Sequence, residues 1–350
     1  MLLPTLYDDP VTEYWALVRD VTMWDVSVER CVEISGPDAF ELTNLITCRD
    51  LTSCEVRQCR YVLLTTADGG IVNDPVLLRL AEDRFWLALA DSDALLYVAG
   101  VAAGRGLDVR IHEADVAPMQ IQGPRSKDVI GALLGDDVRD LPYYRCTEAE
   151  VDGIPVVVSR TGWTGEVGYE IYLQDTSRGD DLWRLVEEAG APHGIRAIAP
   201  SEARRIEAGI FNYGSDMRIE DTPLHVSGLE RLVELDQEQD FIGKEALARI
   251  AQEGVDRKLV GIEISGGPMS DEGALSDLWP VHDPGGSARL GRVTAGAWSP
   301  RLERNVGFAW VPASHAPAGT ELELRTPAGP RPATVHALPF VDPGKDTPKS

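Results

Sequence analysis

The stretch RRIEAGIFNYGSDM (residues 204–217) places a carboxylate where a hydrophobic side chain is expected. Ser201 follows a proline and can act as an N-cap, which predicts a helix that runs to about Gly209. Four residues of this helix share one face, at i, i+3, i+4 and i+7: Ala203, Ile206, Glu207 and Ile210. An ionised carboxylate among apolar side chains is costly unless it meets a hydrogen-bond donor. The donor for Glu207 is either an arginine of the protein or a ligand with two adjacent N–H groups, such as a pterin or a guanine.

The composition of the chain is that of a globular protein and disfavours several classes of partner. The 350 residues are 43% hydrophobic and 26% charged, which allows roughly two or three domains with cores of their own. The formal net charge is −24, so nucleic acid and anionic membranes would repel the chain. The longest apolar runs, such as FWLALA (residues 85–90), are too short to span a bilayer, and no secretory signal is visible. We therefore expect a cytoplasmic protein with neither nucleic acid nor a membrane as its partner.

The cysteines and histidines do not indicate a metal site. The five cysteines include no CxxC pair, and the six histidines show no HxH or HExxH spacing. An odd number of cysteines in a reducing compartment indicates free thiols. We therefore expect no metal ion in this protein.

Hydrophobic alternation and turn residues predict an α+β body followed by an all-β domain. A strand is predicted at residues 31–35, and helices are predicted at residues 92–103 and 179–188. Within residues 255–342, short strands are separated by Gly and Pro, as in a small β-barrel or sandwich. No GxGxxG follows a strand, which disfavours a dinucleotide-binding fold. Residues 343–350 are predicted to form a disordered tail.

A second acid, Asp74, lies in an apolar setting. By the two-residue period of a strand it shares one face with Val72, Val76 and Leu78. Pro75 removes a ladder donor, which predicts an edge strand or a bulge, where a backbone deviation can redirect a side chain. Asp74 either caps a turn or pairs with an arginine, or it is an acid placed in a pocket.

An ordered set of short motifs resembles the glycine-cleavage T-proteins and their folate-dependent relatives. Around the opening helix the motifs are Glu207-Ala208-Gly209, Tyr213-Gly214, Asp216-Met217, Thr222-Pro223 and FIGKEAL (residues 241–247). Further motifs occur in the family's order: WDVS (24–27), GGIVND (69–74), QGP (122–124), RTGWTGEVGYEIYL (160–173), SPRLERNVG (299–307) and LPF (338–340). Any one of these motifs is weak, but the ordered set covers nearly the whole chain.

This resemblance implies a three-domain T-protein-like fold that binds tetrahydrofolate in a central hole. The expected domains are residues 1–50 with 115–225, residues 51–114 with 226–254, and a C-terminal β-barrel of residues 255–342, followed by the tail 343–350. By the resemblance, Glu207 would accept hydrogen bonds from the pterin, and Tyr213 would lie near it. Asp74 would lie beside the reactive nitrogens of the folate, and Arg257 would bind its glutamyl carboxylate.

Three departures from the T-protein pattern bear on the substrate. The chain has DVSVE (residues 25–29) where T-proteins read D-x-S-H-M, and ADSD (residues 90–93) where they carry an Asn that contacts folate. It also has Gly-Trp-Thr-Gly (residues 162–165) in place of Gly-Tyr-Thr-Gly. The phrasing of residues 69–93 looks more like the dimethylsulfoniopropionate demethylase branch, which implies transfer of a methyl group from a small methylated substrate to tetrahydrofolate.

The chemistry of such a donor suggests which residues would bind it. A methyl group on a sulfonium leaves readily as a thioether, so alignment of the reactants is the main task of the enzyme. A sulfonium is held best by aromatic faces, and Trp24 and Trp163 are the candidates, although both could instead be packing residues. Arg160 is a candidate for a carboxylate on the substrate.

Other functions of the same family remain open from the sequence. One is the aminomethyltransferase of glycine cleavage, which needs a lipoylated carrier protein, whereas a demethylase needs none. Another is an O- or N-demethylase with an aryl ether, betaine or methylamine as its donor. The non-catalytic folate-binding protein of iron–sulfur assembly is disfavoured, because the cysteine of its motif is absent from residues 160–166.

Overall fold

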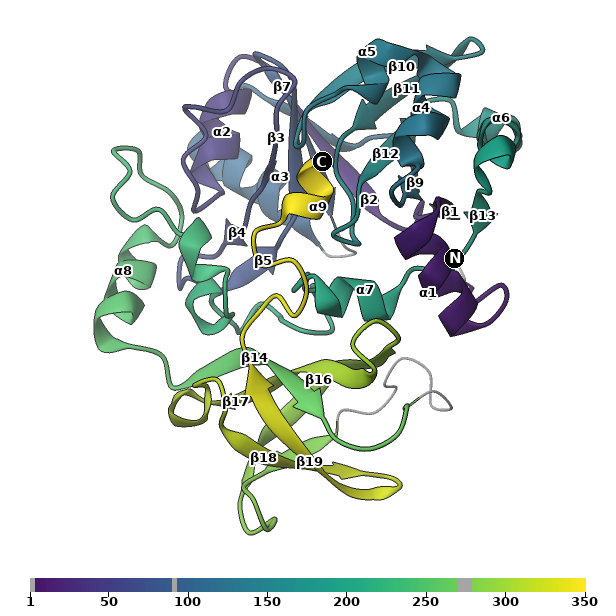
Figure 1. Cartoon of the computed structure of the whole chain (residues 1–350). Helices are drawn as coiled ribbons and strands as arrows, with labels where there is room; N and C mark the ends of the chain where they lie inside the picture. Colours follow the sequence, from purple (N-terminus) through teal and green to yellow (C-terminus); the bar gives the residue numbers. More distant parts are fainter. Residues whose placement is uncertain (1–3, 90–92, 270–278) are drawn as a thin grey trace.

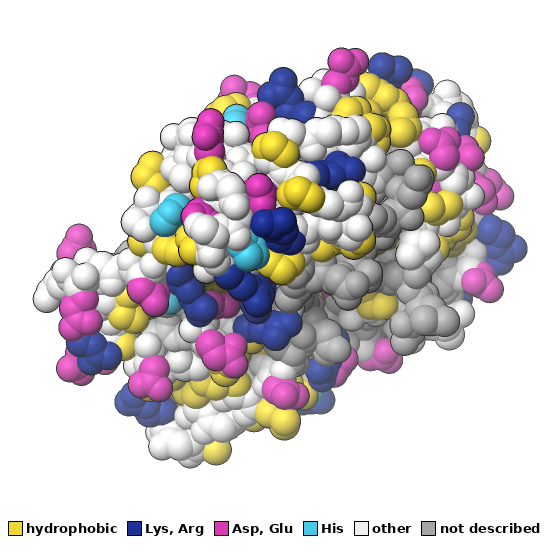
Figure 2. Space-filling model, turned by 90° about the horizontal axis from the view of Figure 1, so that it is seen from below, with side chains coloured by type: hydrophobic (Ala, Val, Ile, Leu, Met, Phe, Trp, Pro, Cys, Tyr) yellow, Lys and Arg dark blue, Asp and Glu magenta, His cyan; other side chains and the backbone are white. Residues whose placement is uncertain are grey.

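The computed structural model describes residues 4–89, 93–269 and 279–350, and it has two β-sheets that pack together next to a closed β-barrel (Figure 1). This arrangement confirms the α+β class with a C-terminal barrel that the sequence predicts. None of the described helices is long and apolar enough to cross a bilayer. On the face shown in Figure 2, acidic side chains are scattered over the surface and basic side chains lie among them.

The first sheet has the strand order β10-β11-β12-β9-β1-β13. Its strands are β1 (Thr22–Asp25), β9 (Ala117–Gln122), β10 (Cys146–Val151), β11 (Ile154–Ser159), β12 (Gly168–Leu173) and β13 (Arg196–Ala197). All neighbours are antiparallel except β1 and β13. Helices α4 (Ser126–Leu134) and α6 (Gly179–Gly190) pack on the face that carries Val156 and Val158 of β11. The helix predicted at residues 179–188 is α6, and α1 (Pro10–Arg19) and α5 (Asp136–Arg139) also belong to this part of the chain.

The second sheet has the strand order β3-β6-β7-β2-β8 and is antiparallel throughout. Its strands are β2 (Arg30–Ser35), β3 (Cys59–Tyr61), β6 (Val76–Ala81), β7 (Arg84–Leu89) and β8 (Arg110–Glu113). Helices α2 (Ala39–Leu45) and α3 (Ala94–Arg105) cover the face that carries Phe85 and Leu87 of β7. The helix predicted at residues 92–103 corresponds to α3.

The two sheets meet through the faces that the helices leave free. Val157 of β11, between the two valines that face the helices, packs in one cluster with Trp86 of β7. The ring of Trp86 also contacts that of Tyr172 on β12 edge to face, at a centroid distance of 5.9 Å. Each of these strands is therefore buried on both sides, and the space left between the sheets is available for a site.

The chain passes from one sheet to another at Asp74 and Pro75. Strand β5 (Ile71–Asn73) pairs only with β4 (Leu64–Thr65), whereas β6 begins at Val76 in the second sheet. The carbonyl of Pro75 accepts the N–H of Val62 at 3.0 Å. The expectation of one strand through residues 72–78 is therefore wrong, because the two-residue period continues across a break that the proline allows. Asp74 lies in that break.

The C-terminal barrel is closed in the order β14-β17-β16-β15-β18-β19, with β14 paired to β19. Its strands are β14 (Arg257–Ile264), β15 (Pro280–His282), β16 (Arg289–Ser299), β17 (Arg304–Pro312), β18 (Glu321–Thr326) and β19 (Gly329–His336). Alternate residues such as Val260 and Ile262 of β14 fill its interior.

Helix α7 (Glu202–Glu207) lies between the sheets and the barrel, as Figure 1 shows. The Oγ of Ser201 accepts the N–H of Arg204 at 3.4 Å, so the predicted N-cap is confirmed. Ile206 packs in one cluster with Phe308 of β17, which joins the helix to the barrel. Before the C-terminal segment, the described residues also form α8 (Lys244–Glu253) and the 3₁₀ helices Thr176–Arg178, Ala191–His193, Pro223–His225, Glu230–Leu232 and Ala313–His315.

The segment after the barrel is folded, so the prediction of a disordered tail is wrong. Its last helix is α9 (Asp346–Lys349), and the carboxylate of Asp342 accepts the N–H groups of Asp346 and Thr347 at 3.0 and 2.8 Å. In Figure 1 this segment leaves the barrel, passes α7 and ends beside the two sheets. The contacts that hold it come from residues distant in sequence, which a local pattern does not reveal.

The strand pairing bears on one of the expected domain boundaries. The sequence-based division assigned residues 1–50 to the first domain, but β2 pairs with β7 and β8 of the second sheet. We propose a boundary near residue 29 instead, and the other bounds of the division remain a proposal.

Candidate active site

A pocket of about 1200 Å³ lies between the two sheets. Its wall is formed by the inner faces of β9 and β12, the turn before β2, the break at Asp74, residues 208–213 after α7, and the C-terminal segment. Of the residues expected in the site from the sequence, four line this pocket: Asp74, Arg160, Trp163 and Tyr213. The pocket therefore brings together residues from both sheets, from the segments on either side of α8 and the barrel, and from none of the barrel strands.

Three of the carboxylates that line the pocket come from three separate elements: Glu29, Asp74 and Glu170. Among the residues that the structure describes, none of the three has a cation within ion-pair distance, and no group of His, Cys, Asp and Glu side chains could hold a metal ion. A carboxylate that is removed from water without a cation is costly to ionise. The pocket thus has an acidic wall that favours a ligand with N–H donors or positive charge.

Glu170 is held rigidly by neutral donors. It lies on β12, where Tyr169 and Ile171 point to the covering helices, so Glu170 points to the second sheet. Its carboxylate accepts hydrogen bonds from Gln120 Nε2 at 2.8 Å and from the hydroxyl of Thr161. Burial raises the pKa of Glu170, while these hydrogen bonds oppose that shift. The sequence reasoning missed Glu170, although an acid on a strand whose residues are all buried is a usable signal.

Asp74 lies at the break between β5 and β6, where its side chain is free to enter the pocket. The phenol of Tyr61 donates to Asp74 Oδ2 at 2.8 Å. Burial raises the pKa of Asp74 to about 7, a shift that the hydrogen bond from Tyr61 partly opposes. An acid with this pKa can gain or lose a proton near neutral pH.

Glu29 is the third acid and was also missed from the sequence. It ends the turn between β1 and β2, and its N–H donates to the carbonyl of Val26 at 2.8 Å. Burial raises its pKa to about 8, and the charges of Glu170 and Asp74 add to the shift. The departure of residues 25–29 from the T-protein pattern was the available signal, because it places a carboxylate at the position of the family's methionine.

The turn that carries Trp163 is built on glycines and on one buried amide. Gly165 has φ of 68°, and a Cβ there would lie 2.7 Å from the Cβ of Ala208. A Cβ on Gly162 would lie 2.2 Å from the amide of Gln122, which donates to the carbonyl of Thr161 at 3.2 Å. The turn therefore packs closely against β9 and α7, and it holds Trp163 at the pocket wall.

The two tryptophans differ in their surroundings. Trp163 is partly exposed in the pocket, with the guanidinium of Arg205 5.4 Å from its ring centroid. Trp24 is 1% exposed, packs with Leu17 and Ile198, and does not line the pocket. This position favours the alternative that Trp24 is a packing residue, and its assignment to the substrate stays a prediction.

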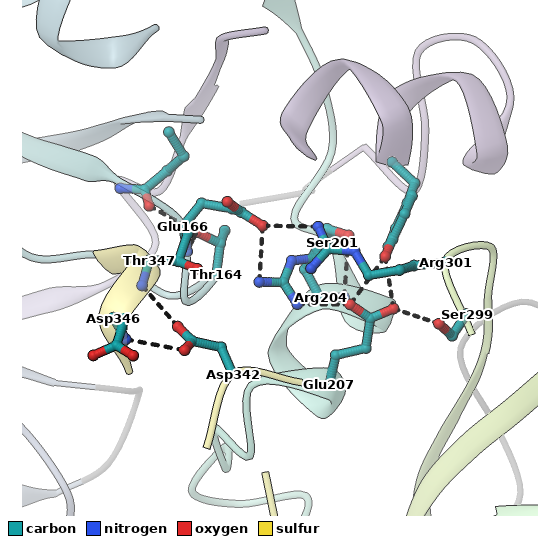
Figure 3. A network of polar contacts seen from close by, with 12 residues as sticks. Thr164, Glu166, Ser201, Arg204, Glu207, Ser299, Arg301, Asp342, Asp346 and Thr347 are labelled. Atoms are coloured by element: carbon teal, nitrogen blue, oxygen red, sulfur yellow. Dashed lines mark hydrogen bonds and ion pairs between the residues drawn. The ribbon is translucent and has the colours of Figure 1, made fainter. Parts of the chain in front are cut away.

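Glu207 does not line the pocket but is fully buried in a cluster of protein donors (Figure 3). Its carboxylate accepts from Arg204 Nη1 at 2.6 Å, from Ser299 Oγ at 2.5 Å and from the phenol of Tyr14 at 2.8 Å. The first alternative for Glu207, an arginine of the protein, is the one that the structure contains. Its assignment to the pterin stays a prediction, and the structure adds that both of its oxygens accept hydrogen bonds from the protein.

The partner arginine links this cluster to the pocket wall. Arg204 Nη2 also pairs with Glu166 at 2.9 Å, and Arg301 donates to the same oxygen at 3.3 Å (Figure 3). Burial raises the pKa of Glu166, and the charges of both arginines oppose the shift. Glu166 and Arg204 both line the pocket, but their charges neutralise each other.

Arg257, expected to bind a carboxylate, lies outside the pocket wall. It is exposed on the barrel, pairs with Asp221 at 2.7 Å and lies 4.9 Å from the ring centroid of Trp310. The assignment of Arg257 to the glutamyl end of a ligand stays a prediction, which its place outside the pocket wall disfavours. Arg160 does line the pocket, but it donates to the carbonyls of Gly168 and Ser350 at 3.0 and 2.9 Å. Of the residues 90–93 that depart from the family's Asn, residues 90–92 lie outside the described part of the chain.

Besides Arg160 and Arg204, three further basic residues line the pocket: Arg231, Lys345 and Lys349. Arg231 is the middle residue of the 3₁₀ helix Glu230–Leu232, and both lysines belong to the C-terminal segment. The chain has only 5 lysines, and two of them lie in its last six residues. The sequence reasoning missed them because it took this segment to be disordered.

Comparison with known proteins places this geometry in a family. The GCVT N-terminal domain matches residues 3–237, and the glycine cleavage T-protein C-terminal barrel domain matches residues 257–342. Dimethylsulfoniopropionate demethylase DmdA of Ruegeria pomeroyi is 39% identical over 335 residues, which are 96% of this chain and 90% of the relative. An aminomethyltransferase of Symbiobacterium thermophilum is 33% identical over 351 residues, 97% of this chain and 91% of the relative.

A solved structure is similar over the same extent. The crystal structure of glycine cleavage system aminomethyltransferase T from Bartonella henselae superposes with a TM-score of 0.84 at 25% identity. The match covers 95% of this chain and 90% of that chain.

Proposed function

The chain belongs to the glycine cleavage T-protein family, and from this premise we propose that it is a tetrahydrofolate-dependent demethylase with a small methylated onium compound as its donor. Membership makes the chain an enzyme of one-carbon transfer that uses tetrahydrofolate. The identity of the one-carbon donor is the proposal, and a sulfonium similar to dimethylsulfoniopropionate is the favoured candidate.

The residues of the pocket fit tetrahydrofolate. A reduced pterin presents N–H donors, for which the carboxylates of Glu29, Asp74 and Glu170 are suitable acceptors. The glutamyl end presents carboxylates, and the same pocket carries Arg231 and the two lysines of the C-terminal segment. When bound, tetrahydrofolate supplies the nitrogen that takes up the one-carbon unit.

The single observation that carries the choice of a cationic donor is the uncompensated acidic wall. Glu29, Asp74 and Glu170 have no ion-pair partner among the described residues, and burial raises the pKa of each. A permanent cation cannot donate hydrogen bonds, but its charge would stabilise these carboxylates and lower their pKa values. Trp163 adds an aromatic face, which suits an onium methyl group.

Asp74 is the pocket residue best suited to act as the general base. A secondary amine that is alkylated becomes positively charged and must lose a proton, while the sulfonium leaves as a neutral thioether. Asp74, with a pKa raised to about 7, can accept that proton at Oδ1, since Oδ2 is occupied by the phenol of Tyr61. Glu29 is already protonated at neutral pH in the free enzyme, because its pKa is about 8, so it is less suited to the role.

An aminomethyltransferase is the second candidate, supported by the relatives of that name and by the T-protein structure. That reaction would need an aminomethyl group on a lipoyl carrier protein, whereas the proposed demethylase needs no carrier. O- and N-demethylation differ in the donor alone; a neutral aryl ether would also need a proton on its leaving oxygen.

The test is a panel of donors incubated with the enzyme and tetrahydrofolate, with the folate product identified by mass. We expect 5-methyl-tetrahydrofolate from dimethylsulfoniopropionate, with no carrier protein and no release of ammonia. A betaine, a methylamine and an aryl methyl ether serve as the other arms. Formation of 5,10-methylene-tetrahydrofolate only with aminomethyl-lipoyl carrier protein would overturn the proposal in favour of the second candidate.

A further inference from the structure

The C-terminal segment, residues 338–350, forms one side of the pocket. The N–H groups of Phe340 and Val341 donate to the carbonyl of Glu207 at 2.9 and 3.1 Å, which fixes the start of the segment to the end of α7. Arg160 donates to the carbonyl of Ser350 at 2.9 Å, which fixes its end to the first sheet. Between these two attachments, the segment contributes Lys345 and Lys349 to the pocket wall.

Three basic side chains come together in the pocket of this acidic protein. The chain has a formal net charge of −24, yet Arg231, Lys345 and Lys349 line one pocket together. Among the described residues, no carboxylate lies within ion-pair distance of any of them. The nearest acid of the segment, Asp342, already accepts the N–H groups of Asp346 and Thr347.

The three cations also disfavour one another in the absence of an anion. Burial lowers the pKa of Lys345, and the charges of Arg231 and Lys349 lower it further, whereas Asp342 acts in the opposite direction. Lys349 Nζ donates to the carbonyl of Gly344 at 2.7 Å, so part of its donor capacity is used, while two N–H groups remain. An anionic group in this part of the pocket would relieve the repulsion between the three side chains.

We propose that Arg231, Lys345 and Lys349 form a carboxylate-binding subsite. The C-terminal segment supplies its two lysines. The carboxylate belongs either to the glutamyl end of tetrahydrofolate or to the one-carbon donor, and the former is expected because it carries two carboxylates. This inference rests on the proposed use of the pocket for tetrahydrofolate. It replaces Arg257, which the barrel keeps outside the pocket.

The test compares two pterins that differ only at the glutamyl end. Anaerobic calorimetry measures the affinity for tetrahydrofolate and for tetrahydropteroate, which lacks the glutamate. We expect the wild-type protein to prefer tetrahydrofolate by about tenfold or more, since charge-assisted hydrogen bonds are lost with the glutamate. The variant K345Q/K349Q should lose this preference while its affinity for tetrahydropteroate stays unchanged, and R231Q should lose part of it.

Two control variants separate the subsite from general charge effects. K127Q removes a lysine on α4, outside the pocket wall, and R257Q removes the arginine on the barrel; both should keep the preference. An equal loss of affinity for both pterins in K345Q/K349Q would mean that the segment only closes the pocket, and the proposal would fall. An unchanged preference together with an unchanged KM for the one-carbon donor would overturn it as well.

Measuring the KM for the one-carbon donor shows whether the bound carboxylate belongs to the folate or to the donor. If K345Q/K349Q raises the KM for the donor and leaves the affinity for both pterins unchanged, the subsite stands and its carboxylate belongs to the donor. The pterin titrations do not depend on which donor the enzyme uses. Failure of the demethylase assay would therefore overturn the proposed function without altering the result for the subsite.

Discussion

The protein contains two groups of buried carboxylates that have opposite surroundings. Glu207 receives Arg204, Ser299 and Tyr14, so its charge is compensated and its oxygens are occupied. Asp74 and Glu170 receive hydrogen bonds from neutral side chains only. The first arrangement stabilises a junction between α1, α7 and the barrel, and the second leaves charge to be balanced by a ligand. In this protein a buried acid therefore indicates a ligand site when no basic side chain of the protein pairs with it.

The largest effect on turnover should come from replacing Asp74, the acid proposed to accept a proton. Asp74→Asn keeps the size of the side chain but removes the base, so we expect kcat to fall about 10²–10⁴-fold. The affinity for tetrahydrofolate should change by less than about threefold, since other groups bind the pterin and the tail. Steady-state kinetics with calorimetry separates the two quantities. Full turnover at saturation would show that Asp74 is not the base.

The junction acid should affect stability rather than turnover. Glu207→Gln leaves Arg204 with one carboxylate fewer in a closed site, and breaking such a pair costs roughly 3–5 kcal/mol of unfolding free energy. Urea denaturation measures this loss. Glu263→Gln, which breaks the exposed pair with Arg304 on the barrel, is the matched control and should cost about 0.2–1 kcal/mol. A variant E207Q with unchanged stability but lost folate affinity would restore the ligand role for Glu207.

The two tryptophans offer the same comparison with aromatic rings. Trp163→Ala should raise the KM for an onium donor by about 2–30-fold, since a cation over an aromatic face contributes about 0.5–2 kcal/mol. Trp163→Phe should keep part of this contribution. Trp24→Phe should lower Tm and leave the KM alone, because Trp24 is a packing residue. Equal effects of the two tryptophans on KM would contradict the distinction.

The pocket acids should also give the free protein an unusual dependence of stability on pH. The folded protein holds protons on Asp74 up to about pH 7 and on Glu29 up to about pH 8, whereas the unfolded chain loses them near pH 4. Between these limits the folded state binds more protons, so the unfolding free energy should fall as the pH rises from about 5 to 8. Urea denaturation across this range should show a flatter profile for Glu29→Gln and Asp74→Asn than for the wild type. A profile of the same slope in all three proteins would contradict the raised pKa values.

Much of the fold could be predicted from local patterns, because its helices and strands are regular. The N-cap at Ser201, the helices near residues 94–105 and 179–190, and the C-terminal barrel all follow from short-range signals. The sheet change at Asp74 and Pro75 could not be seen, since the hydrophobic period runs through it. The folded C-terminal segment depends on the carbonyl of Glu207 and on Arg160, which are far away in sequence.

The site was predictable where a residue type departs from its local pattern. Asp74 and Trp163 were found in this way, and both line the pocket. Glu207 departs from its pattern just as clearly, but the partner that explains it is Arg204, three residues earlier on the same helix. Whether a buried acid faces a cation or a pocket is decided by tertiary packing, which one sequence does not contain. Glu170 was missed for the same reason.

The position of the C-terminal segment has a consequence for synthesis of the protein on the ribosome. Strands β1 and β13 of the first sheet lie more than 170 positions apart, so that sheet cannot be completed until residue 197 has emerged. The barrel is formed by one continuous stretch of sequence and emerges later. The wall of the pocket is complete only after residues 341–349 have emerged as well. Domains generally fold in the order in which they leave the ribosome. A chain whose residues after 340 are still inside the ribosome would therefore have both sheets and the barrel but an open pocket, and it would become able to retain folate only when this segment emerges.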